Sequence, residues 1–160
     1  MQNEKSYKKL RIFVASPGDV TAERERVHAV VAELSRNGNV ADQLSVTLKV
    51  LDWREVTPTM GRAEQVILNE LPVEQWDVFV GILWQRFGTP TGGVNPQTRK
   101  TYDSGTEEEF MLAYRFWKQN HRPQICFYRC NRSVEPDRVD LDQLKKVQEE
   151  AQARLASAKS

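Results

Sequence analysis

The residues best suited to chemistry in this chain lie between Asp103 and Ala113, which read D-S-G-T-E-E-E-F-M-L-A. On a helix with about 3.6 residues per turn, the apolar side chains of this stretch share one broad face, and Glu109 falls within that face. Glu107 and Glu108 are expected to face the other way. A carboxylate on the core side of a helix costs free energy unless another group pairs with it. Glu109 is therefore a candidate catalytic residue.

The same stretch has two interpretations, because it contains two capping boxes, S-G-T-E and T-E-E-E. If Thr106 caps the helix, Glu109 is only the reciprocal capping residue. In the other interpretation Glu109 is an acid at the mouth of a cleft, where helix amino termini keep it ionised. Asp103 would then hold a sugar hydroxyl. Two carboxylates beside a sugar are what cleavage of an N-glycosidic bond requires, since one stabilises or attacks the oxocarbenium-like transition state while the other orients the ribose.

A second polar group, S-P-G-D, directly follows the first apolar run. Its simplest interpretation is a helix start, with Ser16 as N-cap, Pro17 at the first helical position and Asp19 closing a capping box. Exposed backbone N–H groups around Gly18 would also bind an anion or a ribose hydroxyl. The chain has neither a G-x-G-x-x-G fingerprint nor a Walker lysine.

Two residues near a long loop are further candidates for binding a nucleotide. Trp84 is placed to stack on a base or a nicotinamide ring, although an aromatic at such a position also suits the core. Arg86 is a candidate phosphate partner, although single basic residues in loops are commonly just solvated.

Metal chemistry and histidine-based catalysis have little support. His28 and His121 are the only histidines and stand far apart in the sequence. Cys126 and Cys130 match no zinc or redox spacing and fall in an apolar run, which predicts buried thiols. We therefore expect no metal site.

Composition limits the class of protein. At 160 residues the chain has the length of one ordinary domain, and its 39% apolar and 28% charged residues are typical of soluble globular proteins. The net charge of +1 gives no reason to expect binding to nucleic acid or to a membrane surface. No apolar run approaches the roughly 18–20 residues of a membrane helix, and the amino terminus lacks a secretory signal. We expect a cytoplasmic protein.

Apolar periodicity predicts the elements that position these residues. Four apolar runs predict strands at Leu10–Ala15, Val46–Trp53, Asp77–Trp84 and Gln124–Cys130. The first, third and fourth are nearly continuous, as expected for strands that are buried on both faces. Helical spacing predicts helices between and after them, over 20–34, 63–71, 107–120 and about 140–156. Strands and helices in alternation imply a parallel sheet and a small doubly wound α/β domain. Ligands of such sheets bind beyond the carboxyl ends of the strands.

That rule directs attention to the loops over 16–20, 54–62 and 85–106 and to the stretch after Cys130. The third is unusually long for a loop after a strand and is rich in Gly, Pro and Thr, which is typical of a functional lid or of a disordered segment. The carboxyl-terminal helix shows no stop signal, so we expect a single domain over 1–160, with a core of about 9–130, that forms the amino-terminal part of a longer protein.

Three stretches together resemble one family: I-F-V-A-S-P-G-D-V-x-x-E-R at 12–24, W-D-V-F-V-G-I-L-W-x-R-F-G-T-P at 76–90 and S-G-T-E-E-E-F at 104–110. The chain resembles the uncharacterised TIR-like domains found at the amino terminus of NACHT, WD-repeat and TPR-repeat proteins. That family is in turn distantly similar to TIR domains and to nucleoside 2-deoxyribosyltransferases. The resemblance implies a flavodoxin-like parallel sheet of four to five strands flanked by helices.

The resemblance also implies roles for particular residues. Glu109 and Ala113 match an E-x-x-x-A pattern whose glutamate is catalytic, Gly105 matches the glycine before it, and Asp103 matches an upstream sugar-binding aspartate. The implied activity is cleavage of the N-glycosidic bond of NAD or a related nucleotide, with no cofactor. The expected substrate-binding residues are Ser16, Gly18, Asp19, Trp84, Arg86, Ser104, Gly105 and Thr106.

The implied setting is an effector domain of a cytoplasmic STAND-type immune protein in antiphage defence, which self-associates on activation and contacts the carboxyl-terminal domains of its own chain. The alternative is a non-enzymatic oligomerisation adaptor. Two departures from the similar families bear on the choice. Gly105 replaces a tryptophan of many TIR enzymes, and S-P-G-D replaces the Gly-x-Pro loop of the transferases.

Overall fold

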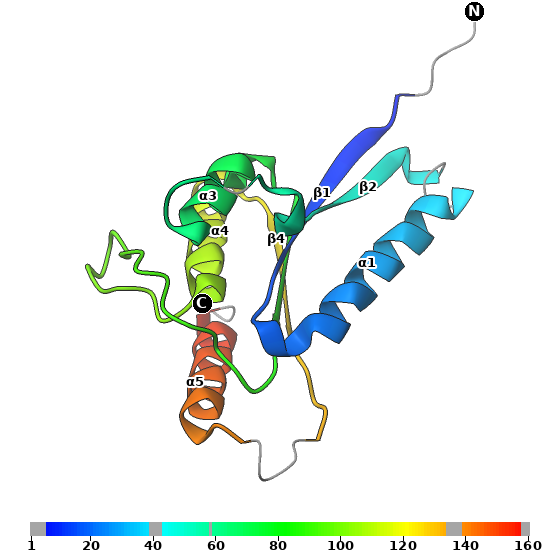
Figure 1. The fold of residues 1–160 in the computed structure, drawn as a ribbon. Coiled ribbons are helices and arrows are strands. Elements are labelled where there is room, and N and C mark those ends of the chain that lie inside the picture. The colour runs from blue at the N-terminus through cyan, green and yellow to red at the C-terminus, as the bar shows by residue number, and fades with distance from the viewer. Residues whose placement is uncertain (1–5, 39–42, 58, 134–138, 158–160) are drawn as a thin grey trace, which may run out of the picture.

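The computed structural model describes residues 6–38, 43–57, 59–133 and 139–157. Its centre is a parallel sheet of β1 (Lys8–Ala15), β2 (Val46–Leu51), β3 (Val78–Leu83) and β4 (Gln124–Arg129), in the order β2-β1-β3-β4 (Figure 1). The chain order reverses between β1 and β3, as in flavodoxin-like folds. The α/β fold expected from the sequence is therefore confirmed, with four strands in the described residues.

The register of the sheet explains why the strands read as continuous apolar runs. Ile12 of β1 is paired with Val50 of β2 on one side and with Val78 of β3 on the other. The central strands β1 and β3 are covered on both faces over their carboxyl-terminal parts, so successive residues from Ile12 in β1 and from Phe79 in β3 are buried whichever way they point.

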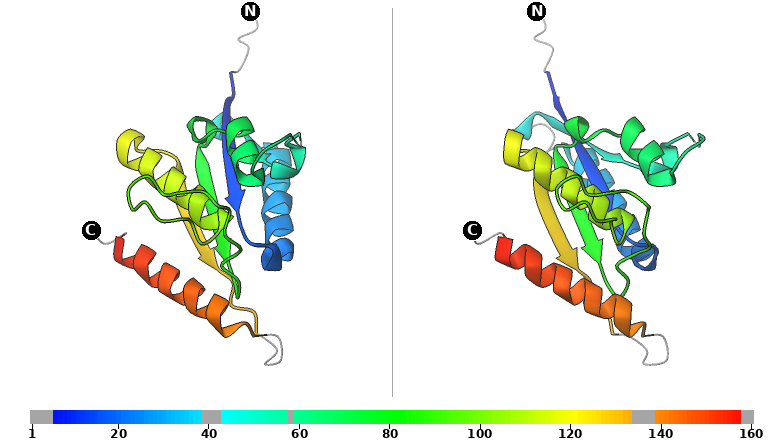
Figure 2. Two further views of the ribbon diagram at one scale, coloured as in Figure 1. Left: turned by 60° about the vertical axis from the view of Figure 1, so that its left-hand side comes forward. Right: turned by 90° about the vertical axis from the view of Figure 1, so that its left-hand side faces the viewer.

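Helices cover both faces of this sheet. Helix α1 (Thr21–Arg36) packs against one face, while α3 (Ala63–Glu70) and α4 (Gly105–Asn120) pack against the other (Figure 2). Helix α5 (Leu141–Ser157) inserts Val147 beside Leu83 near the carboxyl end of β3. Short 3-10 turns lie over Gly18–Val20 (η1), Trp53–Glu55 (η2) and Val73–Gln75 (η3). No helix among the described residues is long and apolar enough to cross a membrane.

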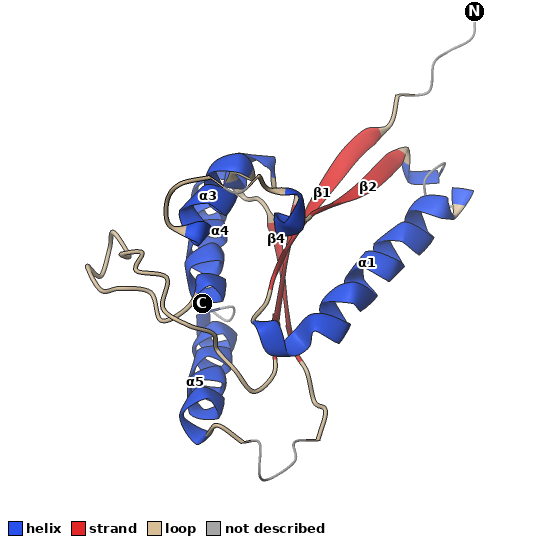
Figure 3. Cartoon of the chain, viewed as in Figure 1, coloured by secondary structure: helices blue, strands red, loops and turns tan. Residues whose placement is uncertain are grey.

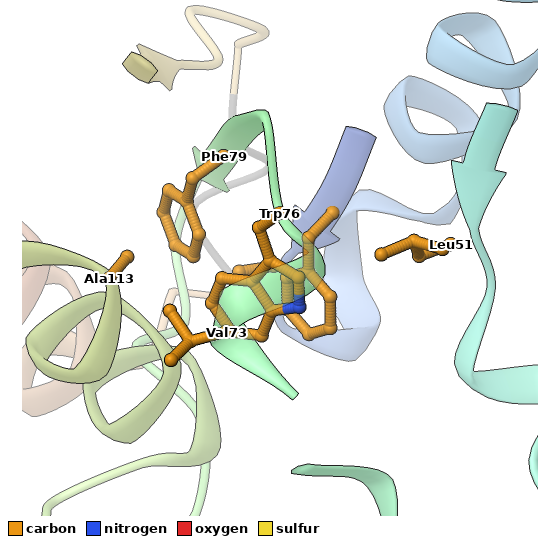
Figure 4. Close-up of a cluster of buried hydrophobic side chains, with 7 residues drawn as sticks. Leu51, Val73, Trp76, Phe79 and Ala113 are labelled. Atoms are coloured by element: carbon orange, nitrogen blue, oxygen red, sulfur yellow. The ribbon is translucent and has the colours of Figure 1, made fainter. Parts of the chain in front are cut away.

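An aromatic core holds α4 in place over the sheet. The rings of Phe13 and Trp76 stack with their centroids 3.9 Å apart, and Phe79 lies next to both (Figure 4). Phe110 of α4 meets the edge of the Phe79 ring, and Ala113 is fully buried in the same cluster. These contacts fix the rotation of α4 and therefore the direction of the side chains in its first turns.

The long connection between β3 and α4 contains no helix or named strand and is drawn as a loop in Figure 3. Val94 and Thr101 form an isolated antiparallel bridge within it. Tyr102 is buried, and its hydroxyl accepts a hydrogen bond from Arg115 of α4 at 3.0 Å. Tyr102 thus ties the end of the segment to α4. Of the loops expected near a ligand, residues 58 and 134–138 lie outside the described residues.

Candidate active site

A cavity of about 580 Å³ opens beyond the carboxyl ends of β1, β2 and β3. This position is the point where strand order reverses, which is where sheets of this kind bind ligands. The volume lies within the roughly 300–1,000 Å³ of small-molecule sites. Its walls come from the end of β1, the segments that follow β1, β2 and β3, and the starts of α1, α3 and α4: Val14, Ser16, Pro17, Gly18, Arg24, Trp53, Arg62, Ala63, Glu64, Ile67, Gly88, Thr89, Pro90, Thr91, Gly105, Thr106 and Glu109.

Glu109 lines this cavity from the second turn of α4 and is 9% exposed. It does not cap the helix. Ser104 is the N-cap, and its hydroxyl accepts the Glu107 N–H at 3.0 Å. The carboxylate of Glu107 in turn accepts the Asp103 N–H at 2.6 Å. The inward orientation expected for Glu109 is confirmed, and the interpretation with Thr106 as cap is wrong because α4 begins at Gly105.

The carboxyl group of Glu109 is hydrogen-bonded to that of Glu64, in the first turn of α3. Burial raises the pKa of Glu109 well above its ordinary value, and the negative charge of Glu64 adds to the rise. Burial also raises the pKa of Glu64, and the charge of Glu108 adds to that. Two carboxyls in contact, one buried and one half-buried, cannot both ionise readily, so the pair holds one proton above the pH at which a solvated glutamate loses its own.

Nothing in the spacing of the sequence singled out Glu64. The only available signal was an acidic residue in the first turn of a helix that follows the carboxyl end of a strand. Many solvated glutamates share that property.

Arg24 of α1 brings a positive charge to the pair. Its guanidinium donates to the Ser16 hydroxyl at 2.6 and 2.9 Å and to the Ser16 carbonyl at 2.8 Å. Its charge opposes the rise in the pKa of Glu109 without cancelling it. The guanidinium lies 5.7 Å from the centre of the Trp53 ring, which is 44% exposed and lines the cavity. Trp53, which the sequence analysis did not select, offers an aromatic surface for a planar ligand.

The other side of the first turn of α4 is closed by an ion pair. The carboxylate of Glu108 accepts hydrogen bonds from Arg62 at 2.6 and 2.7 Å and from the Thr91 hydroxyl at 2.6 Å. Burial alone would raise the pKa of Glu108, but these hydrogen bonds hold it below its usual range. The expectation that Glu108 faces solvent is wrong, because the connection after β3 folds back over it. At Gly93, an added Cβ would lie 2.6 Å from that carboxylate.

Five of the ten predicted site residues line the cavity together: Ser16, Gly18, Gly105, Thr106 and Glu109. Gly105 has a steric role that the sequence could not reveal. A Cβ added there would lie 2.6 Å from Oε2 of Glu64, so the glycine leaves room for the carboxyl pair. Ser16 is not a helix cap, because its hydroxyl is bonded to Arg24, and the turn η1 that begins at Gly18 has no side-chain cap.

Two of the remaining residues precede α4 and do not reach the cavity. Asp103 is exposed, because it lies one residue before the N-cap and outside the helix. Ser104 is fully buried, and its hydroxyl is occupied by the cap.

The other three predicted residues, Asp19, Trp84 and Arg86, also lie outside the cavity lining, near the end of β3. Asp19 accepts the backbone N–H groups of Gln85 and Arg86 at 3.1 and 2.9 Å, and it closes no capping box. The Arg86 residue is exposed. Trp84 stacks under the Arg132 guanidinium at 3.9 Å and donates its indole N–H to the Arg132 carbonyl, away from the cavity lining. Within the described ranges, no group of three or more His, Cys, Asp and Glu side chains is placed to hold a metal ion.

A family described as a domain of unknown function (DUF4062) matches residues 11–159. That match covers every element from β1 to α5. No curated protein and no solved structure matches the chain.

Proposed function

The chain belongs to the family of domains of unknown function DUF4062, and we propose that it is a TIR-like enzyme that cleaves the N-glycosidic bond of NAD or a related nucleotide. The carboxyl pair of Glu64 and Glu109, buried in a cavity at the strand-order switch, carries this proposal. Buried carboxyls with raised pKa values in a cleft are concentrated at catalytic sites.

The chemistry that suits this pair is substitution at an anomeric carbon. As the bond between C1′ of the ribose and the base nitrogen breaks, positive charge develops on the sugar. The pair with one proton carries one negative charge, which stabilises that oxocarbenium-like transition state in a site of low dielectric. Trp53 provides a face on which the base or the nicotinamide ring stacks at the mouth of the cavity.

Support for a TIR-like enzyme also comes from where the three resembling stretches lie. The first contributes Ser16 and Gly18 to the cavity, the second Gly88 and Pro90, and the third Gly105 and Glu109. Motifs far apart in the sequence thus meet at one cavity, as expected if they share a substrate. The biological role that we propose is that of an effector domain in a STAND-type defence protein.

The test is release of nicotinamide from NAD by concentrated protein, followed by chromatography. We expect the wild-type domain to release nicotinamide and Glu109→Gln to lose at least a hundredfold in rate, the lower range for a positioned catalytic carboxyl. Asp103→Asn is the matched control, because this carboxylate is exposed and lies outside the cavity lining. If Glu109→Gln is as active as the wild type, the catalytic assignment is wrong.

A second candidate function is self-association without catalysis, which one observation favours. Strand β4 ends the described sheet, and Tyr128 on it is 58% exposed. An edge strand with an exposed aromatic is a surface on which a second copy can pair. Light scattering of the wild type and of Tyr128→Lys tests this function, which predicts an oligomer that the variant dissociates. A wild-type monomer at every concentration tested contradicts it.

A further inference from the structure

A second cavity, of about 350 Å³, lies between α3, α4 and the connection after β3. It shares no lining residue with the first cavity. Arg62 and Thr91 line the first cavity, and the Glu108 carboxylate that they bind lines the second, so this ion pair separates the two spaces. We propose that the second cavity binds a small molecule that carries an apolar group and a single carboxylate. This inference does not depend on the proposed function.

The size and the lining of this cavity suit a small molecule. Its volume lies within the roughly 300–1,000 Å³ of ligand sites, which are lined mostly by apolar side chains with a few polar groups. Three side chains that share one face of α4, Glu108, Leu112 and Arg115, form one wall. An apolar group of a ligand would be buried among the aliphatic and aromatic lining residues: Leu68, Pro72, Val73, Val94, Pro96, Tyr102 and Leu112.

Hydrogen bonds within the connection form the wall that carries Val94. Val94 pairs with Thr101 in an antiparallel bridge. The side chain of Asn95, which is buried, accepts the Gln97 N–H at 2.9 Å, and the Asn95 backbone N–H donates to the Lys100 carbonyl at 2.8 Å. These bonds close a short hairpin. The hairpin is therefore shaped by its own contacts, which reduces the ordering that a ligand must impose.

Arg115 supplies the charge that selects an anion. Its half-buried guanidinium donates to the Tyr102 hydroxyl at 3.0 Å, and it forms no ion pair with another described residue. A guanidinium has five N–H donors in one plane, and it binds a carboxylate through two parallel hydrogen bonds. Arg115 therefore keeps donors for the carboxylate of a ligand.

The carboxylates of the lining limit the ligand to one negative charge. Glu108 is matched by Arg62, through two hydrogen bonds of 2.6 and 2.7 Å, and it offers little to a cation. Glu74 also lines the cavity but is exposed, and an exposed ion pair contributes little. A phosphate dianion would bring a second negative charge close to these groups, which costs free energy. A monocarboxylate pairs with Arg115 without this cost.

The probe for this site is 4-phenylbutyrate, titrated into the isotope-labelled protein and followed by NMR of the backbone amides. We expect saturable binding that shifts the amides of Leu68, Val94 and Leu112 rather than those of Gly18 and Gly105 in the first cavity. The uncharged analogue 4-phenylbutan-1-ol should bind about 10–100-fold more weakly, the range for a hydrogen bond to a charged group. Butyrate, which lacks the ring, should lose at least tenfold because it buries less apolar surface. The cation 4-phenylbutylamine should bind no better than the alcohol.

Arg115→Gln tests the assignment of the charge. This variant should bind the carboxylate and the alcohol with equal affinity, and it should keep the wild-type affinity for the alcohol, which shows that the cavity is intact. Lys118→Gln removes one positive charge from an exposed position of α4 outside the cavity lining and is the matched control. It should keep the preference for the carboxylate. The ligand series on the wild type tests the charge without any substitution.

Three results would overturn the inference. If 4-phenylbutyrate does not saturate, or shifts the amides of the first cavity instead, the second cavity is not its site. Tighter binding of the amine than of the carboxylate contradicts the class of ligand. A preference for the carboxylate that survives in Arg115→Gln contradicts the role of Arg115. Release of nicotinamide from NAD is measured separately, so failure of this site and failure of the proposed function are distinguishable.

Discussion

The two sides of the first turns of α4 place neighbouring glutamates in opposite environments. Glu108 and Glu109 are almost equally buried, with 7% and 9% of their surfaces exposed. Toward the connection after β3, Glu108 is bound by Arg62 and Thr91, and its pKa lies below the usual range. Toward the cavity, Glu109 contacts another carboxyl, and burial with that charge raises its pKa. Burial alone therefore does not decide the charge of a glutamate; its partners do.

The difference separates a structural role from a functional one. The carboxylate of Glu108 ties the turn before α3 and the long connection to α4. The pair formed by Glu64 and Glu109 leaves a buried oxygen without a partner and places like charges together. A fold gains no stability from that arrangement, and such local costs are concentrated at functional sites.

The largest effect on stability is expected at Glu108, on the side of α4 that faces the connection after β3. Glu108→Gln leaves Arg62 without its anionic partner, and breaking a buried pair in this way costs about 3 kcal/mol. The folded-state pKa of Glu108 is lowered, so its contribution is present above the unfolded pKa and is lost as pH falls through the folded pKa. Urea denaturation at pH 7 and at pH 3 measures both effects, and a difference between variant and wild type that does not shrink in acid contradicts the ion pair.

Crowding the carboxyl pair of Glu64 and Glu109 should reduce activity more than stability. In Gly105→Ala the new Cβ lies 2.6 Å from Oε2 of Glu64, which must move away from Glu109. A shift of about 1 Å in catalytic groups can lower a rate by roughly a hundredfold. Rates of nicotinamide release and urea denaturation of the same variant separate the two effects. A fully active Gly105→Ala protein would show that the position of Glu64 does not matter.

Neutralising the Glu109 carboxyl should stabilise the protein at neutral pH. The folded-state pKa of Glu109 is raised, so its contribution is favourable below the unfolded pKa and is lost as pH rises through the folded pKa. Glu109→Gln avoids this loss, which amounts to about 1.4 kcal/mol for each unit of pKa shift. Denaturation of both proteins at pH 4 and pH 8 should show an advantage of the variant that grows with pH. A variant that is less stable at both values contradicts the account.

The smallest effect is expected at Asp103, which belongs neither to the Glu108 ion pair nor to the cavity lining. Asp103→Asn changes an exposed carboxylate that precedes the N-cap of α4. Its unfolding free energy should stay within about 0.5 kcal/mol of the wild type, as for ordinary surface substitutions. A larger loss of activity than of stability would restore this residue to the site, as the sequence resemblance implied.

Local periodicity explains what the sequence could predict. The parallel sheet follows from apolar runs alternating with helical patterns, and the inward position of Glu109 follows from its spacing to Phe110 and Ala113. Both depend on residues close together in the chain.

The rest of the site depends on contacts between distant segments. Glu64 meets Glu109 across 45 positions, the difference between their residue numbers, because α3 and α4 pack on the same face of the sheet. Glu108 is buried only because Thr91 and Arg62 fold over it. Asp103 precedes α4, as its sequence position predicts, but the position of a residue before a helix does not fix the direction of its side chain, and Asp103 is exposed outside the cavity lining.

The protonation of the pair formed by Glu64 and Glu109 can be measured directly by a carbon-13 NMR titration of the glutamate side-chain carboxyls. Gln variants at 64, 108 and 109 assign the signals. We predict that the pair retains a proton well above the ordinary value of about 4.3, while Glu108 loses its proton below that value. If Glu64 and Glu109 both ionise at or below the ordinary value, they share no proton, and the cavity lacks the group on which the proposed chemistry depends.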